Sequence, residues 1–95
     1  MKKFFKDMAD AIDMLKGIES DLNIKHYTPN ELKVFYTIVV NEAKSGSHCN
    51  ISEVVNSSGM SRSTVYKTLR KLSNAGIIAL DQSQDDKREY LITFS

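Results

Sequence analysis

The 95-residue sequence is poor in several residue types whose abundance would point to a particular protein class. Its single cysteine cannot form an internal disulfide, and such low cysteine usage suits a reducing cytoplasm. No apolar run approaches the roughly 18 residues of a membrane span. Acids at Asp7, Asp10 and Asp13 interrupt the apolar region that a secretory signal would need after its basic start. We therefore expect a cytoplasmic protein with one small hydrophobic core.

The groupings that support catalysis or metal binding are also missing from the sequence. The four glycines fall in expected turns or in a helix and form no phosphate-cradling loop. His26 and His48 have no companions at ligand spacing, and no carboxylate pair or nucleophile with a base stands out. Cys49 is either an oxidant sensor or a packed thiol, and the packed thiol is favoured because His48 is its only basic neighbour. The sequence predicts a protein that is not an enzyme, with no metal and no cofactor.

The net charge of +1 hides a local asymmetry. Residues 1–53 hold seven Lys/Arg against eight Asp/Glu, and residues 81–95 hold two against four. Residues 54–80 hold four basic residues and no acid. A locally positive segment indicates a polyanionic partner better than the total charge does. A solvated helix face would give the same pattern, so charge alone does not decide between the two.

Residues 1–24 are predicted to form an amphipathic helix. Its apolar residues recur at spacings of three and four, which places them on one stripe opposite lysines and acids. Such a stripe can pair with its twin around a two-fold axis, or it can pack across its own domain. We expect dimerisation through this stripe, which comprises Phe4, Met8, Ala11, Leu15, Ile18 and Leu22.

Residues 25–95 are predicted to form one further unit, which opens with a strongly capped helix. Thr28 is a good N-cap, Pro29 suits the first helical position, and Glu31 completes a capping box. The helix is expected to end at residues 45–47. Its buried residues are predicted to be Leu32, Phe35, Ile38, Val39 and Ala43.

A helix-turn-helix pattern follows a short possible strand at residues 49–51. Ser52 is predicted to cap a short helix, and Gly59 supplies the positive φ of the sharp turn after it. Ser61 would cap the second helix, which ends at Gly76. Residues 77–80 and 90–94 resemble strands, and the polar loop between them is long enough to project from the molecule.

The second helix of this pattern presents polar and basic side chains on one face. Burial of Val65, Leu69 and Leu72 leaves the opposite face to donors that can contact bases and phosphates. Three of these donors have simpler alternatives: Ser61 as an N-cap only, Tyr66 packed on the preceding helix, and Lys71 merely solvated. The predicted DNA-binding residues on this helix are Ser61, Arg62, Ser63, Tyr66, Lys67, Arg70 and Lys71.

The order of these pieces resembles the winged-helix core of the MarR family and the related staphylococcal SarA-type regulators. The resemblance rests on the segment from Arg62 to Tyr66, the Gly-Ile-Ile of residues 76–78 and the Asp-Lys-Arg of residues 86–88. It covers about residues 28–93. It implies that Lys87 and Arg88 contact DNA near the minor groove, with Asp86 orienting Arg88. A surface ion pair is the simpler alternative for Asp86 and Arg88.

These observations predict a mostly helical α+β protein: a winged helix-turn-helix with a two- to three-stranded wing and an extra N-terminal helix. The expected function is that of a sequence-specific, double-stranded-DNA-binding transcriptional regulator. It would bind as a homodimer, with the helix of residues 61–74 in the major groove and the wing of residues 81–89 near the minor groove. Two alternatives remain: a winged-helix module that binds protein only, and a plasmid or phage replication or partition factor. The sequence identifies no small-molecule effector.

Overall fold

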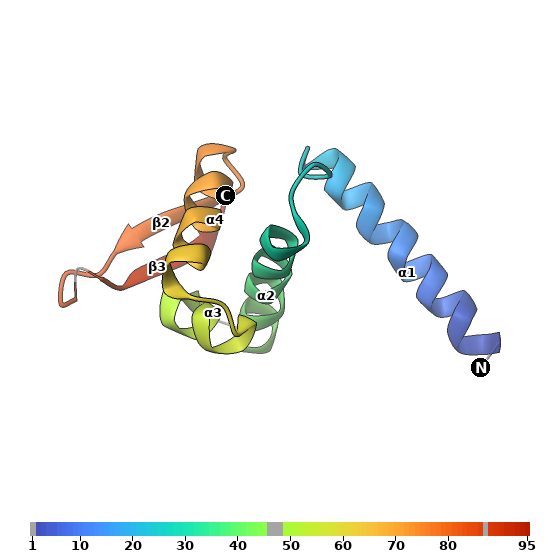
Figure 1. Ribbon diagram of the computed structural model, residues 1–95, viewed down its shortest axis with the longest axis horizontal. Coiled ribbons are helices and arrows are strands. Elements are labelled where there is room, and N and C mark those ends of the chain that lie inside the picture. Colours follow the sequence, from blue (N-terminus) through green and yellow to red (C-terminus); the bar gives the residue numbers. More distant parts are fainter. Residues whose placement is uncertain (1, 46–48, 87) are drawn as a thin grey trace.

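The computed structural model describes residues 2–45, 49–86 and 88–95, and within these ranges the chain forms helices and a small sheet (Figure 1). This arrangement confirms the predicted winged helix-turn-helix with an additional N-terminal helix. The wing projects on the side of the molecule opposite the N-terminal helix. The elements in chain order are α1 (Lys2–Asp21), α2 (Pro29–Ser45), β1 (Cys49–Asn50), α3 (Ile51–Ser58), α4 (Arg62–Asn74), β2 (Ile78–Gln82) and β3 (Tyr90–Phe94).

Side-chain caps set the starts of α2 and α3. The Thr28 backbone N–H donates to Glu31 Oε1 at 2.8 Å, and the Glu31 N–H donates to Thr28 Oγ1 at 3.2 Å, which confirms the predicted capping box. The predicted cap of α3 at Ser52 is wrong. Asn50 is the N-cap, because its Oδ1 accepts from the Glu53 N–H at 2.9 Å and the helix begins at Ile51.

Two glycines allow the chain to turn at either end of α4. Gly59 has φ of 71° at the end of α3, and Gly76 has φ of 78° after the end of α4. Both values lie in the left-handed region that glycine adopts without a Cβ penalty. Ser61 caps α4 by accepting from the Thr64 N–H at 3.2 Å. The predicted turn, cap and helix end are therefore confirmed.

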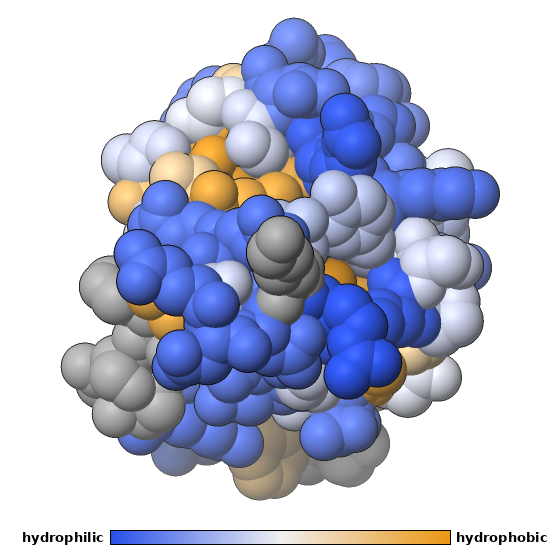
Figure 2. All heavy atoms as spheres, turned by 90° about the vertical axis from the view of Figure 1, so that its left-hand side faces the viewer, coloured by the Kyte–Doolittle hydropathy of each residue, from blue (hydrophilic) through white to orange (hydrophobic). Residues whose placement is uncertain are grey.

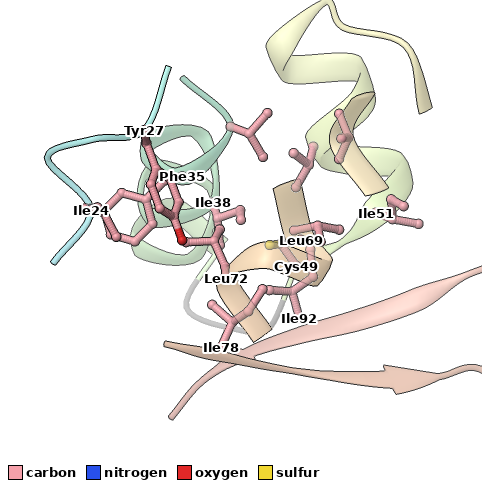
Figure 3. Packing of buried hydrophobic residues seen from close by; sticks show 13 residues of the cluster. Ile24, Tyr27, Phe35, Ile38, Cys49, Ile51, Leu69, Leu72, Ile78 and Ile92 are labelled. Carbon is pink, nitrogen blue, oxygen red and sulfur yellow. The ribbon is translucent and has the colours of Figure 1, made fainter. Parts of the chain in front are cut away.

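The hydrophobic core lies between α2, α3, α4 and the sheet (Figure 3). On α2 the buried residues are Val34, Phe35 and Ile38, whereas Val39 is 39% exposed. The expectation that Val39 and Ala43 are buried is wrong, since the core-facing stripe of α2 is centred on the face opposite Val40. The segment between α1 and α2 contributes Ile24 and Tyr27 to the core.

The sheet has the strand order β1-β3-β2, and both pairs are antiparallel. Ile92 in the central strand β3 lies opposite Cys49 of β1 and Leu80 of β2. The central position of β3 joins the wing hairpin to the strand that precedes α3. The three-stranded form of the predicted sheet is therefore the one observed.

Helix α1 differs from the rest of the chain in its lack of burial. None of its residues between Lys2 and Asp21 is buried. The helix diverges from α2 so that its N-terminus lies far from the core (Figure 1). Its last turn is held to α2 by a hydrogen bond from the Tyr36 hydroxyl to the Glu19 carboxylate. No helix in the described ranges is long and apolar enough to cross a membrane.

Candidate nucleic-acid interface

Helix α4 has one buried face and one exposed face, as the sequence predicts. Val65, Leu69 and Leu72 are buried in the core. Thr68 is buried with them, and its hydroxyl donates to the Thr64 carbonyl at 3.3 Å. The opposite face is exposed and carries Arg62, Ser63, Lys67 and Arg70.

Ser61 has a clear structural role at the start of α4. Its Oγ accepts from the Thr64 N–H at 3.2 Å and lies 2.9 Å from Thr64 Oγ1. Capping with a side-chain oxygen satisfies one of the free N–H groups of the first turn. Ser61 is therefore the N-cap of α4, and its hydroxyl is engaged within the protein.

A cleft of about 440 Å³ separates the start of α4 from the wing. Seen from the wing side, this end of the molecule is mostly hydrophilic, with small apolar areas between the polar side chains (Figure 2). The cleft brings together residues that lie more than 35 positions apart in the sequence. Its lining comprises Ile51, Arg62, Ser63, Tyr66, Arg88 and Tyr90.

The Arg62 guanidinium, which lines the cleft, is bonded to both α3 and the wing. Its Nη2 donates to the Arg88 carbonyl at 3.2 Å and to Ser52 Oγ at 3.4 Å. The same Nη2 lies 3.8 Å from Glu89 Oε2, while the side chain stays 42% exposed. Arg62 therefore connects α4 to the wing, and its exposed part is still available to a partner.

Glu89 completes this connection and was not among the predicted site residues. Its carboxylate accepts from the Ser52 N–H at 3.1 Å and from Ser52 Oγ at 2.7 Å. Ser52 belongs to the first turn of α3, where a carboxylate is favoured by the helix dipole. Both residues are polar and occur in ordinary sequence contexts, so no local pattern identifies the pair.

On the wing, Asp86 contacts Arg88 as the family resemblance implies. Asp86 Oδ1 accepts from the Arg88 N–H at 3.0 Å and lies 3.5 Å from Arg88 Nε. The Arg88 backbone N–H is the main cause of a lowered pKa of Asp86. The Arg88 side chain is 86% exposed. The Arg88 guanidinium is thus oriented through one nitrogen, and its other nitrogens are open to solvent. Lys87, the other predicted contact residue of the wing, lies outside the described residues.

Tyr66 packs on Tyr90 of β3. The ring centroids are 5.4 Å apart, and the two hydroxyls are 3.5 Å apart. The Arg70 guanidinium carbon lies 5.8 Å from the centre of the Tyr66 ring. The hydrogen bond between the hydroxyls lowers the pKa of Tyr66, whereas it raises the pKa of Tyr90. The strand position of Tyr90 was predicted, but its place in the site was not.

Lys71 lies away from the cleft. Its Nζ is 3.0 Å from Glu31 Oε2 and 4.3 Å from the centre of the Tyr27 ring. The pKa of Glu31 is lowered, first by the hydrogen bond from the Thr28 backbone and then by Lys71. The merely solvated alternative for Lys71 is wrong, because its ammonium joins α4 to the start of α2.

Solved structures with a similar fold are winged-helix regulators. MarR superposes with a TM-score of 0.57 at 17% identity, over 99% of this chain and 64% of that chain. The heme-bound sensor PefR from Streptococcus agalactiae gives 0.60 at 13% identity, over 100% and 65%. Overoxidized AbfR bound to DNA gives 0.54 at 21% identity, over 100% and 73%. The chain thus spans less than two thirds of the first two proteins, and the likeness shows a shared fold.

A search of curated proteins finds no match to the sequence. The profile of one family does match, over residues 21–93. That family is described as the sugar-specific transcriptional regulator TrmB. The matched range runs from the end of α1 into β3 and covers most of the chain. By this match, the chain belongs to the TrmB family of transcriptional regulators.

Proposed function

We propose that this protein regulates transcription by binding a specific sequence of double-stranded DNA. The observation that carries the proposal is the continuous exposed surface formed by α4 and the wing. Arg62, Ser63 and Tyr66 meet Arg88 around one cleft, and Lys67 and Arg70 extend the same face along α4. A recognition helix beside a wing is the arrangement with which winged helices engage adjacent grooves.

Helix α4 would lie in the major groove, where its exposed donors reach base edges and phosphates. Lys67 and Arg70 offer charged donors that suit guanine O6 and N7 or phosphate oxygens. The N–H groups near Ser61 and Ser63 favour phosphate, because the start of a helix carries partial positive charge. We leave Lys71 out of this interface, since its ammonium is bonded to Glu31.

The wing of residues 81–89 would lie near the minor groove. Arg88, with Lys87 beside it in the sequence, would supply positive charge there, and Asp86 would hold the Arg88 side chain in position. Asp81, Asp85 and Asp86 make the wing acidic, which weakens its attraction to phosphate. Most of the binding free energy is therefore assigned to α4.

The proposed assembly is a homodimer with two functional parts in each chain. Residues 1–24 would form the dimer contact through the stripe that contains Phe4, Met8, Ala11, Leu15, Ile18 and Leu22. Residues 25–95 would bind DNA. The family match supports this division, because it begins at residue 21 and leaves nearly all of α1 outside. Two recognition helices about 34–36 Å apart would then contact a symmetric site.

Charge removal on α4 tests the proposal. An Arg62→Ala/Arg70→Ala double variant should bind duplex DNA at least about tenfold more weakly than wild type, with a shallower dependence on salt. A Lys16→Ala/Lys25→Ala variant is the matched control, since it removes the same charge from exposed positions outside α4 and the wing. Fluorescence anisotropy at several salt concentrations measures both effects. Equal affinities of the two folded variants would reject the recognition-helix assignment.

Selection of duplexes from a random pool then tests sequence specificity. A regulator should recover one motif with two-fold symmetry, whose half-site spacing reports the dimer geometry. If the wild-type protein binds no duplex in this selection, the alternative of a protein-interaction module is favoured. The DNA-bound state of the AbfR neighbour supports the choice of DNA as the first partner to test.

A further inference from the structure

The face of α2 that points away from the core is hollowed into an open groove. The groove has a volume of about 630 Å³. Apolar atoms of Leu32, Tyr36 and Val40 lie along it, and Val40 is 47% exposed. The complete lining comprises Pro29, Leu32, Lys33, Tyr36, Thr37, Val40, Asn41, Lys44 and Ser57.

Helix α1 presents an apolar stripe that the rest of its own chain leaves exposed. Phe4 and Phe5 are 64% and 62% exposed, and Met8, Ile12 and Leu15 are between 57% and 39% exposed. A 20-residue helix gains little stability from its own hydrogen bonds in water, so an amphipathic helix depends on packing of its apolar face. Exposed apolar patches of this kind mark interaction sites.

The stripe of α1 and the groove of α2 meet at one contact. Glu19 lies four positions after Leu15 and seven after Ile12, so it shares their face of the helix. Its carboxylate accepts the hydrogen bond from Tyr36, which itself lines the groove. The two apolar surfaces therefore adjoin at this hydrogen bond and separate from there as α1 diverges from α2 (Figure 1).

We infer that the α2 groove receives helix α1 of a second copy of this chain, so that two copies exchange these helices around a two-fold axis. This inference rests on the dimer of the proposed function and assigns the surface that each α1 contacts. Each copy supplies one helix and one groove, which gives the self-complementary contact that a two-fold axis requires.

Charge complementarity supports α1 as the occupant of the groove. The lining includes Lys33 and Lys44 and, among the described residues, no carboxylate. The middle of α1 carries Asp7, Asp10 and Asp13 with no basic residue between positions 7 and 15. Asp10 and Asp13 lie on the outer face, whereas Asp7 lies three positions after Phe4 and four before Ala11 and so borders the apolar stripe. The Asp7 carboxylate of one helix can therefore lie beside a lysine of the partner's groove.

The available area is also sufficient for a stable contact. A stable interface buries roughly 800 Å² per partner. A helix of 20 residues is about 30 Å long. Phe4 and Phe5 are 64% and 62% exposed, so each can bury roughly 100–150 Å² more. The other apolar residues of α1 and the groove supply the remainder of the roughly 800 Å², because each copy buries both its helix and its groove.

Two neighbouring valines on α2 provide a matched test. Val40 lines the groove, whereas Val39 does not, and both are partly exposed. Val40→Asp should weaken dimerisation of the 95-residue chain at least about tenfold in sedimentation velocity, and Met8→Asp should do the same. Val39→Asp should change the dimer dissociation constant less than about twofold. Circular dichroism checks that every variant is folded.

Three outcomes would overturn the inference: a wild-type chain that stays monomeric at about 100 µM, a Val40→Asp variant that dimerises like wild type, or equal losses with Val39→Asp. Cross-linking gives a second readout. A mixture of Met8→Cys and Val40→Cys chains should form a mixed disulfide on mild oxidation, and a mixture with Val39→Cys should not. Equal yields would also reject the groove as the docking surface.

The failure of this inference can be distinguished from that of the proposed function. A chain that dimerises through the groove but ignores duplex DNA would contradict only the DNA-binding proposal. A chain that binds DNA through α4 and shows no effect of Val40→Asp on its association would contradict only the helix exchange.

Discussion

Glu89 and Ser52 form a direct link between the wing and the helix-turn-helix. The Glu89 carboxylate accepts from Ser52 Oγ at 2.7 Å and from the Ser52 N–H at 3.1 Å. Glu89 also lies 3.8 Å from the Arg62 guanidinium. One carboxylate at the edge of β3 thus contacts the first turns of both α3 and α4.

Glu89→Ala should destabilise the fold by about 1–2 kcal/mol, because hydrogen bonds to a charged group contribute about 1.5–3 kcal/mol when buried and less when partly exposed. Urea unfolding followed by circular dichroism measures this loss. Asp85→Ala serves as the control, since it removes one exposed carboxylate from the same wing. If both variants unfold at the same urea concentration, Glu89 does not secure the wing.

Asp86→Asn should weaken binding to the selected DNA by about three- to tenfold, because Arg88 loses its orienting carboxylate. Asp85→Asn removes the same charge without touching Arg88, so it should leave affinity unchanged or raise it slightly. Fluorescence anisotropy at one salt concentration compares the two. An increase in affinity with both variants would show that only the wing's net charge matters.

The contribution of Glu31 should depend on pH. Contacts with Thr28 and Lys71 lower the pKa of this carboxyl in the folded state. Its stabilising effect is therefore complete above the unfolded-state pKa of about 4.3 and is lost as the pH falls through the lower folded-state pKa. The difference in melting temperature between wild type and Glu31→Gln should shrink between pH 7 and pH 3. A difference that stays constant would contradict this assignment.

Cys49 should react slowly with thiol reagents in the folded protein. Burial is the main cause that raises the pKa of its thiol to about 11, with smaller contributions from Glu53 and Glu42. The thiolate is the reactive form, so little of it exists near pH 7.5. Reaction with a disulfide reagent should accelerate at least about a hundredfold in denaturing urea. Fast reaction of the folded protein would instead support the oxidant-sensor alternative.

Local chemistry made several features of this fold predictable from sequence. The Thr28–Glu31 capping box, the Ser61 cap and the turns at Gly59 and Gly76 each depend on residues within a few positions of one another. The exposed face of α4 followed from helical periodicity in the same way. These features required no knowledge of the tertiary structure.

The features that sequence did not predict depend on distant partners. Asn50 and Ser52 are both good N-caps, and Ser52 is instead bonded to Glu89, which lies 37 positions away. The bond between Lys71 and Glu31 joins residues 40 positions apart, so the sequence around neither residue predicts it. Tyr90 belongs to the site only because its ring meets that of Tyr66, 24 positions earlier on α4. No periodicity or motif carries such information.

The turn at the end of the wing has a further consequence. Ser83 donates its N–H to the Glu89 carbonyl at 2.8 Å, and its Oγ accepts from the N–H groups of Asp85 and Asp86 at 3.2 and 3.3 Å. Hydrogen bonds thus fix both sides of the turn before any partner arrives, which reduces the conformational entropy lost on binding. In the proposed complex, the distance between α4 and Arg88 would therefore be set before binding and would suit only a limited range of groove widths. Base pairs that touch no side chain could still change affinity by altering the width of the minor groove.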